Sequence, residues 1–135
     1  MRPVLLDTNI FTALKNGDSQ ICQIVQSADT ILISAIVIGE LLYGYDGGTK
    51  SKQNRLQLQQ FLDSPRVKII SVTSDTAHFF SQVSLALKQK GKPIPTNDVW
   101  IAAQAFEHGS FVCTYDKHFH AIEGLSIVTS ISDFV

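Results

Sequence analysis

Short apolar runs alternate along the chain with longer segments that have the spacing of amphipathic helices. Five runs of β-branched or apolar residues have the length of strands, at 4–6, 30–34, 67–71, 111–114 and 126–129. Six segments between them predict helices, at 9–14, 19–28, 36–45, 51–62, 74–90 and 97–107. This order of elements predicts an α/β sandwich around a mainly parallel sheet of about five strands.

Glycine and proline mark where the expected helices end. Gly17, Gly91, Gly109 and the Gly47-Gly48 pair each follow a helical pattern, as does Pro65. In the expected helix at 74–90, one apolar stripe is formed by Ala77, Phe80, Val83 and Leu87. The stretch from 46 to 53 has the strongest loop character, and we expect it to be mobile.

Composition limits the size and class of the protein. The 135 residues are 44% hydrophobic and include eight phenylalanines, which suffices for one core, so we expect a single domain over 1–135. The net charge of −1 gives no global attraction to a polyanion or an anionic membrane. No apolar stretch approaches the length of a membrane span, and the N-terminus does not have the pattern of a signal peptide, so we expect a cytoplasmic protein. Cys22 and Cys113 fit reduced thiols within helical and strand patterns.

Four carboxylates occupy equivalent places relative to these elements. Asp7 and Asp116 come just after apolar strand runs, whereas Glu40 and Asp98 lie near the starts of expected helices. In a parallel α/β sheet, the carboxyl ends of strands and the amino ends of helices meet at one edge, where ligands bind. The four acids are therefore expected to converge. A divalent cation would relieve their mutual repulsion and the cost of partial burial.

Each acid also has an ordinary structural interpretation. Asp98 would interact favourably with the dipole of its helix, and Asp7 could cap the helix that follows it. Asp116 could be a turn residue, and Glu40 could face solvent on a narrow polar stripe, although its neighbours are mostly apolar. The functional interpretation depends on all four acids together.

Four segments carry a resemblance to a known family. "LLDTNI" at 5–10, "SAIVIGELLYG" at 34–44, "PTNDVWIAAQA" at 95–105 and "TYDKHF…IEGLSIV" at 114–128 resemble the motifs of PIN-domain ribonucleases. The resemblance is greatest to the VapC-like toxins of toxin–antitoxin pairs, and it covers nearly the whole chain. It implies a PIN-like three-layer α/β/α sandwich.

The resemblance also implies roles for particular residues. Asp7, Glu40, Asp98 and Asp116 would form a catalytic site for Mg²⁺ or Mn²⁺, with Asp7 and Asp98 as the principal direct ligands. Carboxylate oxygens suit such hard cations. Residues that match supporting positions of the family, and that are equally explained as cap or turn residues, are Thr8, Asn9, Ser34, Asn97 and Thr114. Beside so many carboxylates, we expect His118 and His120 to have surface or stacking roles.

The implied activity is endonucleolytic hydrolysis of RNA that leaves a 3′-hydroxyl and a 5′-phosphate. The implied partners are the RNA substrate, a cognate antitoxin protein and a second copy of the chain in a homodimer. Basic residues that could hold phosphates are Lys50, Lys52, Arg55 and Lys117, whereas the lysines at 88–92 are better explained as a solvated helix end. Tyr43 and Trp100 could stack on bases, although aromatic residues on such helices more often belong to the core or to an oligomer contact.

Two other classes of protein remain open at this point. A phosphotransfer domain of the haloacid-dehalogenase or receiver type also has an Asp after its first strand. A dehalogenase-like phosphatase would need a second Asp two residues later, where this chain has Asn9, and the further Asp and Lys of a receiver are not matched. A non-catalytic PIN-like binding module would usually lack one or more of the four acids.

Overall fold

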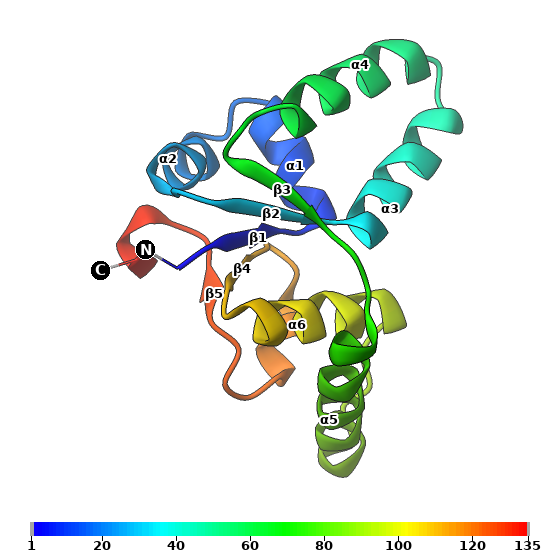
Figure 1. Ribbon diagram of the computed structural model, residues 1–135, viewed down its shortest axis with the longest axis vertical. Helices are drawn as coiled ribbons and strands as arrows, with labels where there is room; N and C mark the ends of the chain where they lie inside the picture. Colours follow the sequence, from blue (N-terminus) through cyan, green and yellow to red (C-terminus); the bar gives the residue numbers. More distant parts are fainter. Residues whose placement is uncertain (1, 135) are drawn as a thin grey trace.

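The computed structural model describes residues 2–134 and is built around a five-stranded sheet in the order β3-β2-β1-β4-β5 (Figure 1). The strands are β1 (Val4–Leu6), β2 (Ile31–Ser34), β3 (Val67–Ile70), β4 (Phe111–Cys113) and β5 (Ile127–Val128). All of the neighbouring strands in this sheet pair in parallel, in agreement with the sequence prediction. β1 is central, and its three residues are fully buried.

The helices form layers on both faces of the sheet. They are α1 (Thr8–Lys15), α2 (Ser19–Ser27), α3 (Ala35–Asp46), α4 (Ser51–Leu62), α5 (Ser74–Lys90) and α6 (Thr96–His108). Two 3₁₀ segments follow, η1 (Lys117–Ala121) and η2 (Ile131–Phe134). Figure 1 shows α1, α2 and α4 on one side of the sheet and α5 and α6 on the other. Among the described residues, no helix is long and apolar enough to cross a membrane.

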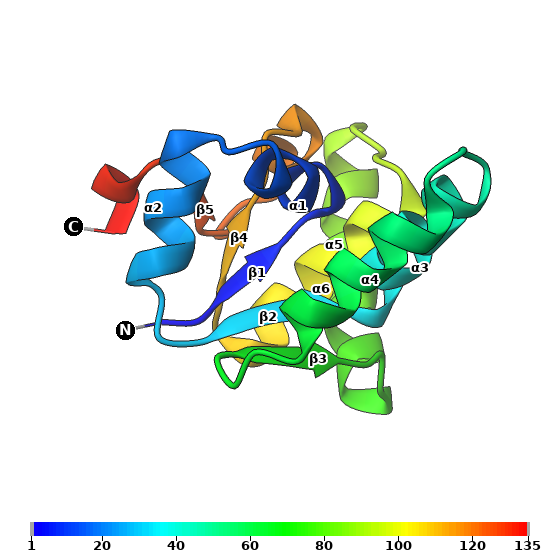
Figure 2. The ribbon, with the colours of Figure 1, turned by 90° about the horizontal axis from the view of Figure 1, so that it is seen from above.

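The strand order explains this division. The chain steps from β1 to β2 to β3 in one direction, and then returns past β1 to β4 and β5. Right-handed crossovers therefore place α1 to α4 over one face and α5 and α6 over the other. Figure 2 shows the result from above, with α3 and α4 side by side beyond the sheet.

The core lies between the sheet and these helices. Along α6, Ile101, Ala102 and Ala105 follow Asp98 by three, four and seven residues, which places them on its face of the helix, and they are buried against the rest of the core. The small alanines allow the helix to pack close to its neighbours. Asp98 is therefore held at the amino end of a rigid, well-packed helix.

Two expectations from the sequence need correction. In α5, Ala77 is exposed and Thr76 is buried instead, because the Thr76 hydroxyl donates a 2.6 Å hydrogen bond to Glu107 Oε1 on α6. The loop expected over 46–53 is shorter and covers only 47–50, since α3 extends to Asp46 and α4 begins at Ser51. The Asp46 carboxylate accepts hydrogen bonds from Ser51 and Arg55, which closes the connection.

Candidate active site

The point where the chain changes direction in the sheet lies between β1 and β4. These two strands are neighbours, but their helical connections lie on opposite faces. In open α/β sheets, this arrangement forms the ligand-binding crevice at the carboxyl ends of the strands. Asp7 directly follows β1, and its backbone N–H donates to Cys113 O at 3.0 Å, which continues the pairing with β4. Asp116 lies three residues beyond the end of β4, and Asp98 lies in the first turn of α6. The fold thus brings three of the four acids to one crevice.

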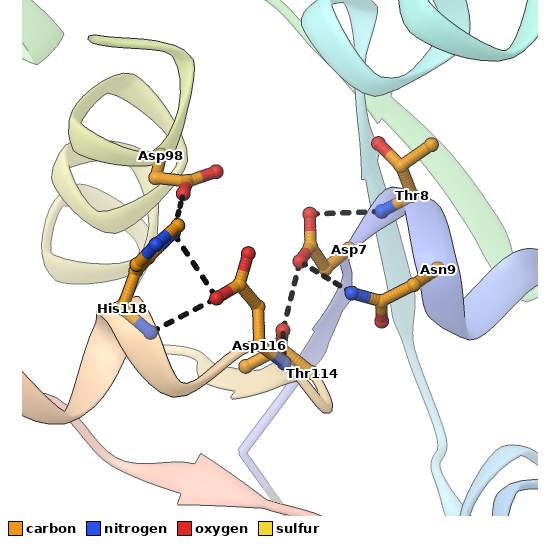
Figure 3. Close-up of polar contacts among 7 residues, drawn as sticks. All are labelled: Asp7, Thr8, Asn9, Asp98, Thr114, Asp116 and His118. Atoms are coloured by element: carbon orange, nitrogen blue, oxygen red, sulfur yellow. Dashed lines mark hydrogen bonds and ion pairs between the residues drawn. The ribbon is translucent and has the colours of Figure 1, made fainter. Parts of the chain in front are cut away.

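Asp7 is a buried carboxylate with donors at both oxygens. Its residue is only 4% exposed and caps α1, where Oδ1 accepts from the backbone N of Thr8 at 2.8 Å. Oδ2 accepts from Thr114 Oγ1 at 2.8 Å and from Asn9 Nδ2 at 3.4 Å (Figure 3). Asp7 is therefore a helix cap, as its structural interpretation predicts, and its buried carboxylate lies beside the other acids.

Thr114 connects two of the acids. Its buried hydroxyl donates to Asp7 and accepts from the backbone N of Asp116 at 2.9 Å. Because one hydroxyl makes both bonds, the position of the loop after β4 is fixed relative to the end of β1. Thr114 and Asn9, which the sequence suggested as supporting residues, thus contact Asp7 directly.

His118 lies between Asp98 and Asp116. Its Nδ1 is 3.2 Å from Asp98 Oδ2 and 3.1 Å from Asp116 Oδ1, and its backbone N donates to the same Asp116 oxygen at 2.9 Å (Figure 3). Figure 3 also shows Asp116 between Asp98 on one side and Asp7 on the other. One ligand atom from each of Asp98, Asp116 and His118 lies within 4.8 Å of the others.

Glu40 reaches this edge from α3. Its Oε1 accepts a 2.9 Å hydrogen bond from Thr8 Oγ1, and Thr8 is the residue next to Asp7. Ser34 begins α3 by capping it, with Oγ accepting from the backbone N of Ile36 at 3.1 Å. Ser34 therefore affects the acids through the placement of α3. Asn97 is exposed in the first turn of α6.

Burial and neighbouring charges disfavour the ionised forms of Asp7 and Asp98. Burial raises the pKa of Asp7 above its ordinary value, opposed by the hydrogen bonds from Thr114 and Thr8, while the charges of Glu40 and Asp116 raise it further. Burial also raises the pKa of Asp98, opposed by the hydrogen bond with His118 and reinforced by the charges of Asp7 and Asp116. Oxygen donors with this unrelieved repulsion fit a divalent cation.

Comparison with known proteins identifies the family. The profile of the PIN domain matches residues 4–125. The chain belongs to the PIN-domain family. It is 34% identical over 126 residues to ribonuclease VapC2 of Rickettsia felis, covering 90% of this chain and 92% of that protein.

Two solved VapBC structures contain a chain with the same fold. The crystal structure of VapBC2 from Rickettsia felis, bound to a DNA fragment from their promoter, has a TM-score of 0.84 at 29% identity, with 93% of this chain and 97% of that chain covered. The DNA-bound VapBC structure from Salmonella typhimurium also gives 0.84, at 27% identity and with coverage of 95% and 98%. The family and the fold inferred from the four sequence motifs are thus confirmed.

Three of the four candidate substrate-binding residues of this PIN domain lie apart from the acids, and the fourth adjoins Asp116. Lys50, Lys52 and Arg55 line a shallow depression at the start of α4, and Lys117 is exposed beside Asp116. The Arg55 guanidinium forms an ion pair with Asp46 at 2.6 Å, so its charge is largely engaged within the hairpin. Lys50, Lys52 and Lys117 are exposed and can contact phosphates.

Trp100 and Tyr43, the two candidates for stacking on bases, differ in how exposed their rings are. Trp100 stacks on Phe80, with ring centroids 3.8 Å apart, so it belongs to the packing between α5 and α6. Tyr43 is 85% exposed on α3, one turn beyond Glu40. Of the two, only Tyr43 offers a free ring face.

His118 is the residue whose place in the site sequence reasoning missed. We expected a surface or stacking role for it, but its ring contacts two of the acids. The available signal was its spacing of two residues from Asp116, which lets an Asp-capped turn bring the ring back toward the carboxylate.

Proposed function

We propose that this protein is a Mg²⁺-dependent endoribonuclease and the toxin of a toxin–antitoxin pair. The observation that carries the proposal is the convergence of Asp7, Asp98 and Asp116 at the crevice between β1 and β4 in a chain of the PIN-domain family. Glu40 is the fourth acid of this group, and its carboxylate accepts a hydrogen bond from Thr8, the residue next to Asp7. Ribonuclease VapC2 of Rickettsia felis, as a similar protein over most of its length, supports RNA as the substrate.

The proposed chemistry assigns a role to each contact described above. Asp7, Asp98, Asp116 and Glu40 would hold the cation, with Mn²⁺ able to replace Mg²⁺. When bound, the cation polarises a phosphodiester and lowers the pKa of an attacking water. Thr114 and the backbone of Thr8 keep the Asp7 carboxylate in one orientation. The family resemblance favours cleavage that leaves a 3′-hydroxyl and a 5′-phosphate.

RNA must be held against a negative site by nearby cations. Lys117 adjoins Asp116, and Lys50 and Lys52 lie on the protruding α3–α4 hairpin. We infer that these lysines contact the phosphates of RNA, and that Arg55 contributes less because it is paired with Asp46.

Two protein partners belong to the proposal. Similarity to the VapBC structures supports a cognate antitoxin, and the family resemblance supports a homodimer. Size-exclusion chromatography with light scattering, on the chain alone and co-expressed with the product of an adjacent gene, would test both. A monomer that retains no partner would contradict both.

The alternative classes have less support. A receiver-type sheet has the order 2-1-3-4-5, whereas this sheet has the order 3-2-1-4-5. A dehalogenase-like phosphatase would need a second acid where Asn9 instead donates to Asp7. A binding module without activity would usually lack one or more of the four acids, and Asp7, Glu40, Asp98 and Asp116 are all present.

The test is cleavage of total cellular RNA by purified, antitoxin-free protein with Mg²⁺, with Mn²⁺ or with EDTA. We expect discrete fragments that require metal and that disappear in the Asp7→Asn and Glu40→Gln variants. Glu123→Gln is the matched control, because Glu123 is exposed and lies outside the site. Folded wild-type protein that cleaves no RNA with either metal would favour the binding module.

A further inference from the structure

His118 is positioned by the same turn that carries Asp116. Asp116 caps the 3₁₀ segment η1, and its Oδ1 accepts from the His118 backbone N at 2.9 Å. This turn directs the imidazole toward α6, where Nδ1 lies 3.2 Å from Asp98 Oδ2. The ring is thus fixed between two elements that are far apart in the sequence.

Nδ1 is separated from two carboxylate oxygens by distances similar to those between neighbouring ligands of one metal ion. Nδ1 is 3.1 Å from Asp116 Oδ1 and 3.2 Å from Asp98 Oδ2. In an octahedron with metal–ligand bonds of ~2.1 Å, adjacent ligand atoms are separated by about 3.0 Å. Nδ1 therefore stands close to the spacing of adjacent ligands from each of two carboxylate oxygens, and the three atoms lie within 4.8 Å of one another.

The tautomer of His118 with its proton on Nε2 would present the Nδ1 lone pair to this position. The side chain is 52% exposed, and its contacts among the described residues are the two carboxylates and its own turn. The same separations suit a hydrogen bond from a protonated Nδ1, which would only fill the gap between the acids in the absence of metal. If Nδ1 ligates the cation, replacement of His118 should weaken metal binding. If Nδ1 only donates a hydrogen bond to the acids, replacement should not weaken it.

We propose that His118 Nδ1 is a direct nitrogen ligand to the cation and makes the site selective for Mn²⁺ over Mg²⁺. This inference rests on the proposed metal-dependent function and adds to it a specificity-determining residue. Mg²⁺ is bound through oxygen and keeps several waters, whereas an imidazole nitrogen suits first-row transition metals. A mixed site of two carboxylates and one imidazole therefore favours Mn²⁺.

The experiment measures metal binding directly on untagged, antitoxin-free protein. Mn²⁺ affinity is measured by electron paramagnetic resonance, Mg²⁺ affinity by competition, and nitrogen ligation by electron spin-echo modulation of the bound Mn²⁺. The variants are His118→Ala and His118→Asn. His120→Ala is the control, because His120 is an exposed histidine on the same 3₁₀ segment. Circular dichroism confirms that each variant is folded.

We expect imidazole nitrogen modulation in the wild type and in His120→Ala, but not in either His118 variant. Mn²⁺ affinity should fall by about 10-fold or more in His118→Ala, with a smaller change for Mg²⁺. If Mn²⁺ binds without nitrogen modulation while the wild type still cleaves RNA, the inference is overturned and the proposed nuclease stands. If neither Mn²⁺ binding nor cleavage is found, both fail.

Discussion

Thr114 donates a 2.8 Å hydrogen bond from Oγ1 to Asp7 Oδ2, although the two residues are 107 positions apart in the chain. The same hydroxyl accepts from the backbone of Asp116, so a single side chain sets the spacing between the ends of β1 and β4. One consequence of this hydrogen bond, three of shifted carboxylate pKa values and one of a buried amide can be measured.

Replacement of Thr114 by Val keeps the shape of the side chain but removes both hydrogen bonds. We expect the free energy of unfolding to fall by about 1.5–3 kcal/mol, because a buried carboxylate loses its donor. RNA cleavage should also decrease, since Asp7 is no longer held in one orientation. Urea denaturation and a cleavage assay would measure the two effects. Thr114→Ser, which retains the hydroxyl, should keep most of the activity, and equal losses in both variants would contradict this role.

Replacement of Asp98 by Asn should stabilise the metal-free protein while abolishing cleavage. The raised pKa of Asp98 means that the fold disfavours its ionised form, and Asn has the same shape without the charge. We expect the Tm in EDTA at pH 7 to rise by roughly 2–5 °C. Added Mn²⁺ should raise the Tm of the wild type more than that of the variant. An unchanged or lower Tm in EDTA would show that Asp98 is not under electrostatic strain.

The stabilising effect of Asp98→Asn should depend on pH. Between the unfolded pKa and the raised folded pKa, the folded state binds more protons, so the wild type gains stability as the pH falls through the folded pKa. The difference between variant and wild type in EDTA should therefore shrink as the pH falls from 7 toward 4.

The pKa of Asp18 is shifted in the opposite direction to that of Asp98. Hydrogen bonds from the backbone of Ile21 and from the Tyr115 hydroxyl lower the pKa of Asp18. Its contribution to stability is present above the unfolded pKa and is lost as the pH falls through the folded pKa. Asp18→Asn should therefore destabilise the protein at pH 7, and less so near pH 3, in chemical denaturation. The same sign of pH dependence in both variants would contradict the assignment.

Gln104 is fully buried in α6, and within residues 2–134 neither its Oε1 nor its Nε2 has a hydrogen-bond partner. Gln104→Met has a similar volume and removes the unsatisfied amide. We expect the free energy of unfolding to increase by about 1 kcal/mol or more. Gln57→Met, at an exposed position of α4, should change it little. Destabilisation by Gln104→Met would indicate that the amide has a partner in solution.

Much of the fold could be predicted from the sequence because its signals are local. Buried parallel strands have continuous apolar runs such as Val4–Leu6, and helices stop at glycines such as Gly91 and Gly109, which adopt positive φ. The buried face of α5 could not be predicted fully. Thr76 turns inward because of Glu107 on another helix, and the sequence of α5 carries no trace of that partner.

The positions of the acids in the candidate site could be predicted from the sequence, but the side-chain contacts of Glu40 and His118 could not. The positions of Asp7, Asp98 and Asp116 follow from their places at strand and helix ends, which topology brings together. The Thr8–Glu40 bond and the ring of His118 depend on side-chain directions between distant segments. Such directions are decided by packing and by short turns, not by periodicity.

The central position of β1 has a consequence for how the protein is made. Residues up to 95 contain Asp7 and Glu40 but neither Asp98 nor Asp116, and β1 obtains its β4 neighbour only when residues 111–113 are available. Domains fold from chains that emerge N-terminus first. A ribosome-bound fragment therefore has no assembled acidic centre. A protein that cleaves RNA would thus remain harmless to its own messenger until nearly the whole PIN domain has been translated.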